Sequence, residues 1–312
     1  MGGNGQRRLR GVSAVLSLIL LAGLGATSAA GAATEGSATP AVACSLSLGS
    51  GGARGEHSRQ EIRATVPPSI TPTWTTEHVY TAGGPWMSSR FQYEPGPAGG
   101  GHADGWVAVG DGLYRSQYNT DENQQLVGRP IYRRVGGGWG MFRAFEESQY
   151  VDASFDRTNE YALRNQDGTL FRWTVDAKGG WHKAGTAAGF SAVKAMALIS
   201  KTRTYDTFLA NTHSGGLYTI HIPTKLPMKP VVKVVRKSTW QGFDTLIAQG
   251  CGNGVLLLGI NRDTEVAYLY AVGHANGTAT PIQNRGKLPA TLTPSTYFRW
   301  GYIPDLDRFG GE

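Results

Sequence analysis

A strand–turn–strand pattern occurs four times between residues 107 and 272, and this repeat restricts the chain to few folds. The copies cover residues 107–118, 161–175, 208–222 and 257–272. Successive copies lie 57, 47 and 51 residues apart, measured between Leu113, Leu170, Leu217 and Tyr268. Each copy is rich in β-branched and aromatic residues and is interrupted by Gly, Asn or Asp turns. A repeat of about 50 residues with four short strands is typical of a propeller blade.

Tryptophans, several of them preceded by glycines, mark a similar period. They are Trp86, Trp139, Trp181, Trp240 and Trp300, with steps of 53, 42, 59 and 60 residues. Segments rich in small residues follow three of them, at 151–155, 193–198 and 244–248. Small side chains suit the innermost strand of a blade, where the blades crowd together. We expect each tryptophan to pack between neighbouring blades, because an indole buries a large apolar area.

The two ends of the repeat region predict that the ring closes on itself. Residues 77–86 match residues 130–139 in kind, so the N-terminal segment reads as the outer strand of a blade that the C-terminus begins. Such closure pairs both free strand edges. The sequence therefore predicts an all-β fold, a β-propeller of five blades. Four blades are the first alternative and a β-sandwich is the second.

The pattern resembles that of the five-bladed propeller lectins of the tachylectin family. The resemblance rests on the Trp-x-x-Phe phrases that begin at Trp139 and Trp240 and on turns that lead into Leu-Tyr or Leu-Phe, and it covers roughly residues 75 to 300. It implies carbohydrate binding at several equivalent sites near the blade interfaces. The unequal repeat spacing of this chain departs from that family.

The N-terminal region predicts export. Residues 1–33 combine Arg7, Arg8 and Arg10 with an apolar core at 12–24 and small residues up to Ala33, as in a signal peptide. Residues 34–70 are rich in Ala, Ser, Gly and Thr, which predicts a flexible linker before a propeller domain at 71–312. No later segment is long and apolar enough to span a membrane, so we expect a secreted, extracellular protein.

Two cysteines bear on that compartment. Cys44 and Cys251 exclude a four-cysteine zinc site, and outside the cytoplasm they favour a disulfide between them. A lipid-modified Cys44 is the alternative. The sequence predicts no bound metal and no cofactor, because the seven histidines are scattered and no phosphate-binding loop occurs.

The charge of the chain suggests a class of partner. The net charge is +7, and it falls to +4 without residues 1–33, which hold three Arg and no acid. Residues 225–237 concentrate five positive charges and no acid. They are interpreted either as an edge strand guarded by lysines or as a patch for an anionic cell-wall polymer. Nucleic acid is not expected as a partner of a secreted chain without a recognition motif.

Candidate ligand-binding residues lie in the repeated turns and at the tryptophans. Amide and carboxylate groups bind sugar hydroxyls, and an indole face packs on the C–H side of a sugar ring. The candidates are Asn165, Asp167, Asn211, His213, Asn261, Asp263, Trp139, Trp181 and Trp240. The competing interpretation is that the polar residues only shape hairpin turns.

Two other functions stay open. Asp152, Asp206 and Asp244 stand near predicted strand starts, so a glycoside-processing enzyme would use them as a converging pair of carboxylates. A protein-docking scaffold in a secreted assembly is the other alternative. The favoured prediction is a non-enzymatic protein that binds a glycan or an anionic cell-wall polymer through repeated sites.

Overall fold

The computed structural model describes residues 44–81, 83–293, 296–301 and 308–312, all of which belong to the unit Val42–Glu312. These residues form 21 β-strands and one short helix, η1 (Trp139–Met141), so the all-β prediction is confirmed. The predicted signal peptide, residues 1–33, lies outside the described residues. Within the described part of the chain, no helix has the length and apolarity needed to cross a membrane.

Three separate sheets each contain four antiparallel strands that follow one another along the chain. The first sheet holds β9 (Phe142–Asp152), β10 (Phe155–Arg164), β11 (Leu170–Val175) and β12 (Trp181–Ala187). The second holds β13 (Val193–Lys201), β14 (Tyr205–Thr212), β15 (Leu217–Pro223) and β16 (Val231–Arg236). The third holds β17 (Thr245–Cys251), β18 (Gly254–Asn261), β19 (Val266–Val272) and β20 (Ile282–Lys287).

A fourth, nine-stranded sheet joins the two ends of the described region. Its first part holds β5 (Met87–Pro95), β6 (Gly101–Val109), β7 (Gly112–Thr120) and β8 (Leu126–Gly137). Its second part holds β21 (Thr296–Gly301), β1 (Ser45–Gly51), β2 (His57–Arg63), β3 (Ser69–Ile70) and β4 (Trp74–Thr76). Strand β21 pairs antiparallel with β1 and parallel with β5. The C-terminal strand therefore pairs with the N-terminal region, as predicted, but through β1. The outer strand predicted at residues 77–86 is wrong, because its described residues form no strand.

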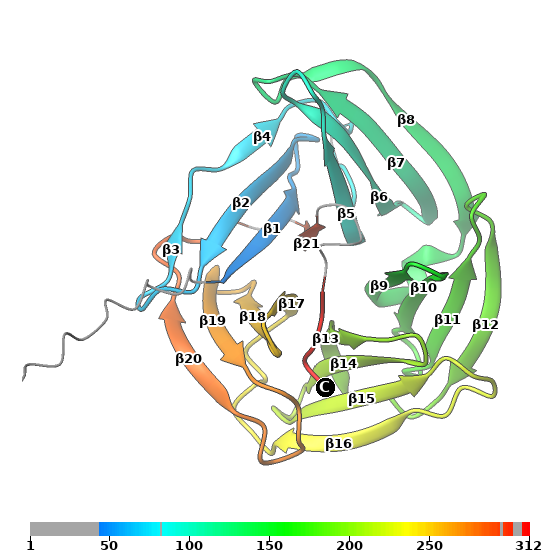
Figure 1. The fold of residues 1–312 in the computed structure, drawn as a ribbon, viewed down its shortest axis with the longest axis vertical. Helices are drawn as coiled ribbons and strands as arrows, with labels where there is room; N and C mark the ends of the chain where they lie inside the picture. The colour runs from blue at the N-terminus through cyan, green and yellow to red at the C-terminus, as the bar shows by residue number, and fades with distance from the viewer. Residues whose placement is uncertain (1–43, 82, 294–295, 302–307) are drawn as a thin grey trace, which may run out of the picture. The chain divides into compact units, whose positions relative to one another are not determined.

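The first strands of successive sheets contact one another, β5 with β9, β9 with β13, and β13 with β17. Strand β17 in turn contacts both β1 and β21. Figure 1 shows these first strands near the middle of the unit and the last strands, β8, β12, β16 and β20, at its periphery. The described strands thus converge on one centre.

The prediction of a flexible linker over residues 34–70 is wrong for residues 44–70, the part that the structure describes. Residues 44–70 contain β1, β2 and β3, and Leu46, Leu48 and Ile62 are buried. Strand β1 receives hydrogen bonds from β21, some 250 residues later in the chain. Short strands rich in serine and glycine carry little local signal, because the burial that stabilises them comes from a distant partner.

One buried residue joins each group of four strands to the next. Its backbone N–H donates to a carbonyl in the turn between the second and third strands of the preceding group. The five bonds are Tyr80 to Gly55 (2.8 Å), Trp139 to Asp111 (3.0 Å), Phe190 to Gly168 (3.1 Å), Trp240 to Gly215 (3.0 Å) and Leu292 to Glu265 (2.9 Å). All five residues, which we call the docking residues, are less than 10% exposed. Each therefore anchors the chain as it passes from one group of strands to the next.

The docking residues correct the predicted role of the tryptophans. Trp139 and Trp240 lie at this junction, but Trp181 lies on the peripheral strand β12 and Trp300 on β21. Trp86 stands just before β5, where its N–H donates to the carbonyl of Ala108. Phe190, Tyr80 and Leu292 occupy the other junctions. The position requires a buried apolar side chain, which residues other than tryptophan supply.

A disulfide joins Cys44, at the start of β1, to Cys251, at the end of β17, with the Cα atoms 5.7 Å apart. The predicted pairing is confirmed. The bridge closes a loop of 207 residues and links two neighbouring sheets.

Replacing both cysteines by serine is expected to lower the free energy of unfolding by about 2 to 5 kcal/mol, because the unfolded chain loses a long-range constraint. Chemical denaturation of the double variant beside the oxidised wild type measures this difference. Unchanged stability would show that the bridge constrains little. A Ser45→Ala variant, which leaves both cysteines in place, is the matched control.

His57 is a fully buried histidine on β2. Five aromatic rings surround it, those of Tyr80, Phe91, Tyr118, Phe298 and Trp300. Its Nδ1 lies 2.7 Å from the Tyr118 hydroxyl oxygen, and its Nε2 has no hydrogen-bond partner among the described residues. Burial lowers the pKa of His57 to about 3, because the cage disfavours the charged ring.

The depressed pKa predicts acid sensitivity. Between pH 6.5 and about 3 the unfolded histidine binds a proton that the folded one does not, so its contribution to stability is lost as the pH falls. The slope is at most about 1.4 kcal/mol per pH unit. We expect His57→Phe to flatten the decrease in Tm between pH 7 and 4. The exposed His213→Phe serves as the control, and an equal slope in all three proteins would contradict the assignment.

Candidate functional site

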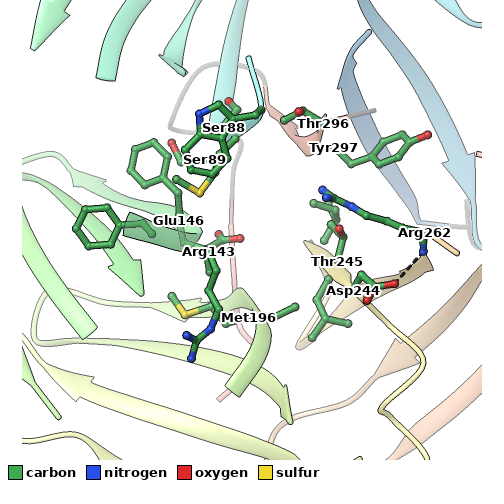
Figure 2. A pocket seen from close by; sticks show the side chains of 18 of the residues that line it. Ser88, Ser89, Arg143, Glu146, Met196, Asp244, Thr245, Arg262, Thr296 and Tyr297 are labelled. Carbon is green, nitrogen blue, oxygen red and sulfur yellow. Dashed lines mark hydrogen bonds between the residues drawn. The ribbon is translucent and has the colours of Figure 1, made fainter. Parts of the chain in front are cut away.

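A cavity of about 300 Å³ lies where the first residues of the central strands meet, and we call it the central pocket. Its walls come from the starts of β5, β9, β17 and β21 and from the N-terminal part of β13. Figure 2 shows its side chains converging from all these strands. They include Trp86, Met87, Ser88, Ser89, Arg143, Glu146, Asn165, Met196, Asp244, Thr245, Arg262, Thr296 and Tyr297.

The pocket holds polar groups that the protein itself leaves available. Ser89 is buried, and its hydroxyl has no hydrogen-bond partner among the described residues. Arg262 is exposed and extends from the wall toward the middle of the pocket in Figure 2. Its side chain forms no ion pair with any carboxylate of the described chain. The guanidinium is thus free to bind a ligand, whereas the Ser89 hydroxyl is covered by the protein.

Asp244 is held firmly at the edge of the pocket. Its Oδ1 lies 2.6 Å from Nζ of Lys194, and its Oδ2 accepts the backbone N–H of Arg262 at 2.9 Å. Partial burial acts in the opposite direction, but these bonds keep the pKa of Asp244 below its ordinary value. Asp244 is therefore an ionised and already paired carboxylate near neutral pH.

Trp86 supplies an aromatic surface to the same pocket. The side chain is 37% exposed, and its Nε1–H donates to the carbonyl of Gly110 at 2.9 Å. That bond fixes the indole in place. Phe142 and Met196 add buried apolar walls. The pocket therefore combines a fixed aromatic surface with hydroxyl, amide and guanidinium groups.

Arg143 lines the pocket but serves the scaffold. Its guanidinium donates to the carbonyls of Val193, Arg164, Asn165 and Phe190 at 2.9 to 3.0 Å. These bonds tie β9 to the turn of its own sheet and to the start of the next sheet. The side chain points away from the middle of the pocket (Figure 2), so its donors are already used.

The predicted ligand residues are dispersed. Asn165 is exposed and lines the central pocket. Asn211 is fully buried, and its amide bonds Ala195 N–H and the carbonyls of Trp240 and Phe243 at 2.8 to 3.0 Å. Exposed turns carry the polar side chains of Asp167, His213 and Asp263, while Asn261 is half-buried.

Hydrogen bonds within the turns occupy two of these side chains. Asp167 accepts from Arg164 and from the backbone of Thr169, and Asn261 accepts from the backbone of Thr264. The three predicted tryptophans do not line the central pocket: Trp139 and Trp240 are buried docking residues, and Trp181 packs edge-on against Trp106.

The three aspartates of the enzymatic alternative lie in different surroundings. Asp206 is fully buried and accepts hydrogen bonds from Ser148, Arg157, Asn159 and Tyr161. Asp152 is exposed at the last residue of β9, and Ser154 caps it. Of the three, Asp244 alone lines the central pocket.

Sequence reasoning missed most of the central pocket. Ser89 and Glu146 belong to no repeated motif, Arg262 lies in a repeated turn but was not among the candidates, and Trp86 is predicted at a blade interface. Each of these residues lies either near the start of a central strand or in the turn after the second strand of a sheet. The small-residue segments predicted at 193–198 and 244–248 indicate part of this region, because both contain residues that line the pocket.

A second cavity of about 450 Å³ lies between β5–β7 and β9–β11, and its polar lining is largely paired. Arg115 donates to both carboxylate oxygens of Asp104, and Arg90 lies 3.0 Å from Glu147. Among the described residues, no group of three or more His, Cys, Asp or Glu is arranged to hold a metal ion.

Comparison with known proteins gives matches among solved structures. No protein-family model matches the chain, and no curated protein matches it. A solved structure of a fungal lectin from Aleuria aurantia, described as a six-bladed β-propeller with a novel mode of fucose recognition, is similar with a TM-score of 0.47 and 11% identity. The match covers 85% of this chain and 88% of that lectin. The resemblance to the tachylectin family stays a prediction.

The geometry of Asn211 predicts a structural role. Asn211→Ala leaves one N–H and two carbonyls without their partner in a buried site, so we expect a loss of about 2 to 4 kcal/mol in the free energy of unfolding. Asn165→Ala, at an exposed position, should change it by less than about 0.5 kcal/mol. Denaturation of the two variants tests this contrast, which equal effects would contradict.

Proposed function

We propose that this chain is a secreted five-bladed β-propeller that binds a carbohydrate in the central pocket and does not transform it. The observation that carries the proposal is the composition of that pocket. A fixed, half-exposed indole lies with an unpartnered buried hydroxyl and an unpaired guanidinium where all the central strands converge.

Five blades are supported by the strand groups and their junctions. Three sheets and the β5–β8 half of the fourth each supply four strands, and β21, β1 and β2 with the short β3 and β4 supply a fifth group. The five docking residues repeat the same backbone bond after every group. The five first strands would then be the innermost strands of the blades, with the central pocket at one end of the axis.

A carbohydrate suits the pocket for chemical reasons. A sugar ring presents C–H groups on its faces and hydroxyls around its rim, so it needs an aromatic surface beside planar polar groups. Trp86 provides the surface, and Asn165 and Arg262 provide the polar groups. The volume of about 300 Å³ is at the lower end of the range for small-molecule sites, which fits one or two sugar units.

Two observations support secretion. Residues 1–33 have the charge pattern and apolar core of a signal peptide. The Cys44–Cys251 disulfide is of a kind that forms and persists in oxidising compartments.

Binding without turnover is supported by the carboxylates. Asp206 is sealed in a network of four donors, Asp152 stands at the opposite end of β9 from the pocket, and Asp244 is paired with Lys194. The glycoside-processing enzyme and the protein-docking scaffold, the alternatives from the sequence, are kept as outcomes of the experiment.

The test is a glycan array with the residues 34–312 of the chain, followed by calorimetry with any glycan retained. Trp86→Ala, Asn165→Ala and Arg262→Ala are each expected to weaken binding about tenfold or more, because each removes a contact worth roughly 1 to 3 kcal/mol. Trp74→Ala and Asn123→Ala are the matched controls, since both residues are exposed outside the central pocket.

Three results would overturn the proposal. The first is an array without any retained glycan. The second is release of a chromophore from an aryl glycoside, lost in Asp244→Asn, which would favour the enzyme. The third is a stoichiometric protein partner that co-purifies and whose binding the three pocket variants leave intact, with no glycan bound.

A further inference from the structure

The peripheral strands carry a one-sided charge. Strands β8, β12, β16 and β20 together contain eight Lys or Arg residues and no Asp or Glu. The acids of the sheets lie instead on central and neighbouring strands, such as Glu146 and Glu147 on β9 and Asp104 on β6. Figure 1 shows the four basic strands around the outside of the unit. We call their exposed cations the peripheral cations.

Two of the eight cations donate hydrogen bonds to backbone carbonyls. Arg236 donates to the carbonyls of Val235 and Thr280 at 2.7 and 2.8 Å, and Arg285 donates to the carbonyl of Ala64 at 2.7 Å. The other six are exposed, and none forms an ion pair with a described carboxylate. They are Arg129, Arg133, Arg134, Lys183, Lys233 and Lys287. Lys225, Lys229 and Lys237 extend this set on either side of β16.

Protection of strand edges does not account for this pattern by itself. Charged residues at an edge, lysine above all, discourage pairing with another chain, but this protection does not require all eight charges to be positive. A surface of one sign, without compensating acids, raises the local concentration of counter-ions of the opposite sign. The acids nearest in sequence, such as Asp121 before β8 and Asp176 before β12, lie in hairpin turns outside these strands.

Apolar side chains accompany the cations. Ile131 and Tyr132 on β8 are 61% and 43% exposed, and Val231 and Val232 on β16 are each 50% exposed. A polyanion of phosphates alone gains nothing from such groups. A polysaccharide presents carboxylates or sulfates to the cations and C–H faces to the apolar side chains.

We propose that the peripheral strands bind an acidic polysaccharide, with β8 and β16 as the principal contacts. This surface is separate from the central pocket, so the proposal does not depend on the glycan bound there. The polymer lies along the outside of the sheets, and ion pairing with the peripheral cations releases its counter-ions.

The experiment measures binding of fluorescent polygalacturonate to the residues 34–312 of the chain between 50 and 200 mM salt. The plot of log K against log salt is expected to have a negative slope. Arg129→Gln, Arg133→Gln and Arg134→Gln together should make the slope shallower by about two to three and weaken binding at 50 mM salt by tenfold or more. The same change at Lys229, Lys233 and Lys237 tests β16 in the same way.

The matched control removes three exposed cations from elsewhere, through Arg54→Gln, Arg63→Gln and Arg203→Gln, and so changes the net charge equally. It should retain most of the affinity. Trp86→Ala should retain all of it, which separates this surface from the central pocket.

The proposal is overturned if the control triple variant loses as much affinity as the β8 variant, because net charge alone would then explain binding. Equal binding of neutral dextran would also overturn it. Tighter binding to double-stranded DNA or to vesicles of phosphatidylglycerol than to polygalacturonate would assign the surface to another class of partner.

Discussion

The junction between successive strand groups depends on one backbone hydrogen bond and the apolar residue that makes it. Tyr80, Trp139, Phe190, Trp240 and Leu292 each donate to a turn of the preceding group and are buried there. The turn must come very close to the passing chain: a Cβ at Gly168 would lie 2.0 Å from the backbone N of Ser191. Glycine therefore supplies both the left-handed turn at Gly168 and the space for the contact. Each group of strands is thus joined to the next at the equivalent turn, the one between its second and third strands.

The position of these junctions determines where the central pocket forms. Because each junction delivers the chain to the start of a central strand, the first residues of these strands meet at one place. Side chains from distant parts of the sequence, such as Ser89, Asn165 and Arg262, line a single pocket there. At the other end, residues 308–312 approach the ends of the central strands, as the bond from Gly311 N–H to the Ile199 carbonyl shows. The central pocket and the C-terminal residues thus lie at opposite ends of the central strands.

Features of the fold that depend on local sequence patterns could be predicted from the sequence. Alternating residues and turn glycines were enough for the three four-stranded sheets, and two cysteines together with the predicted export were enough for the disulfide. The strand β1 was missed because its partner β21 lies at the far end of the chain. Phe190 was missed because a junction selects for buried apolar volume, and tryptophan is one of several residues that provide it. Asn211 looked like Asn165 in sequence, but one is a buried cross-link and the other an exposed pocket residue. The central pocket as a whole has no motif, since its residues come from strand starts and from the turns that follow the second strands.

The distribution of charge follows from the same geometry. Central strands are packed on all sides, so a carboxylate there must find a partner or keep its proton. Arg90 pairs with Glu147 at 3.0 Å, whereas burial first and the charge of Glu147 second hold the pKa of Glu160 well above its ordinary value. Peripheral strands have one open edge, and their charges stay in water at little cost. Buried acids such as Glu147 and Asp206 are therefore paired with arginines, whereas the four peripheral strands carry exposed arginines and lysines and no acid. The modest net charge of the whole chain is thus distributed so that these four strands are basic.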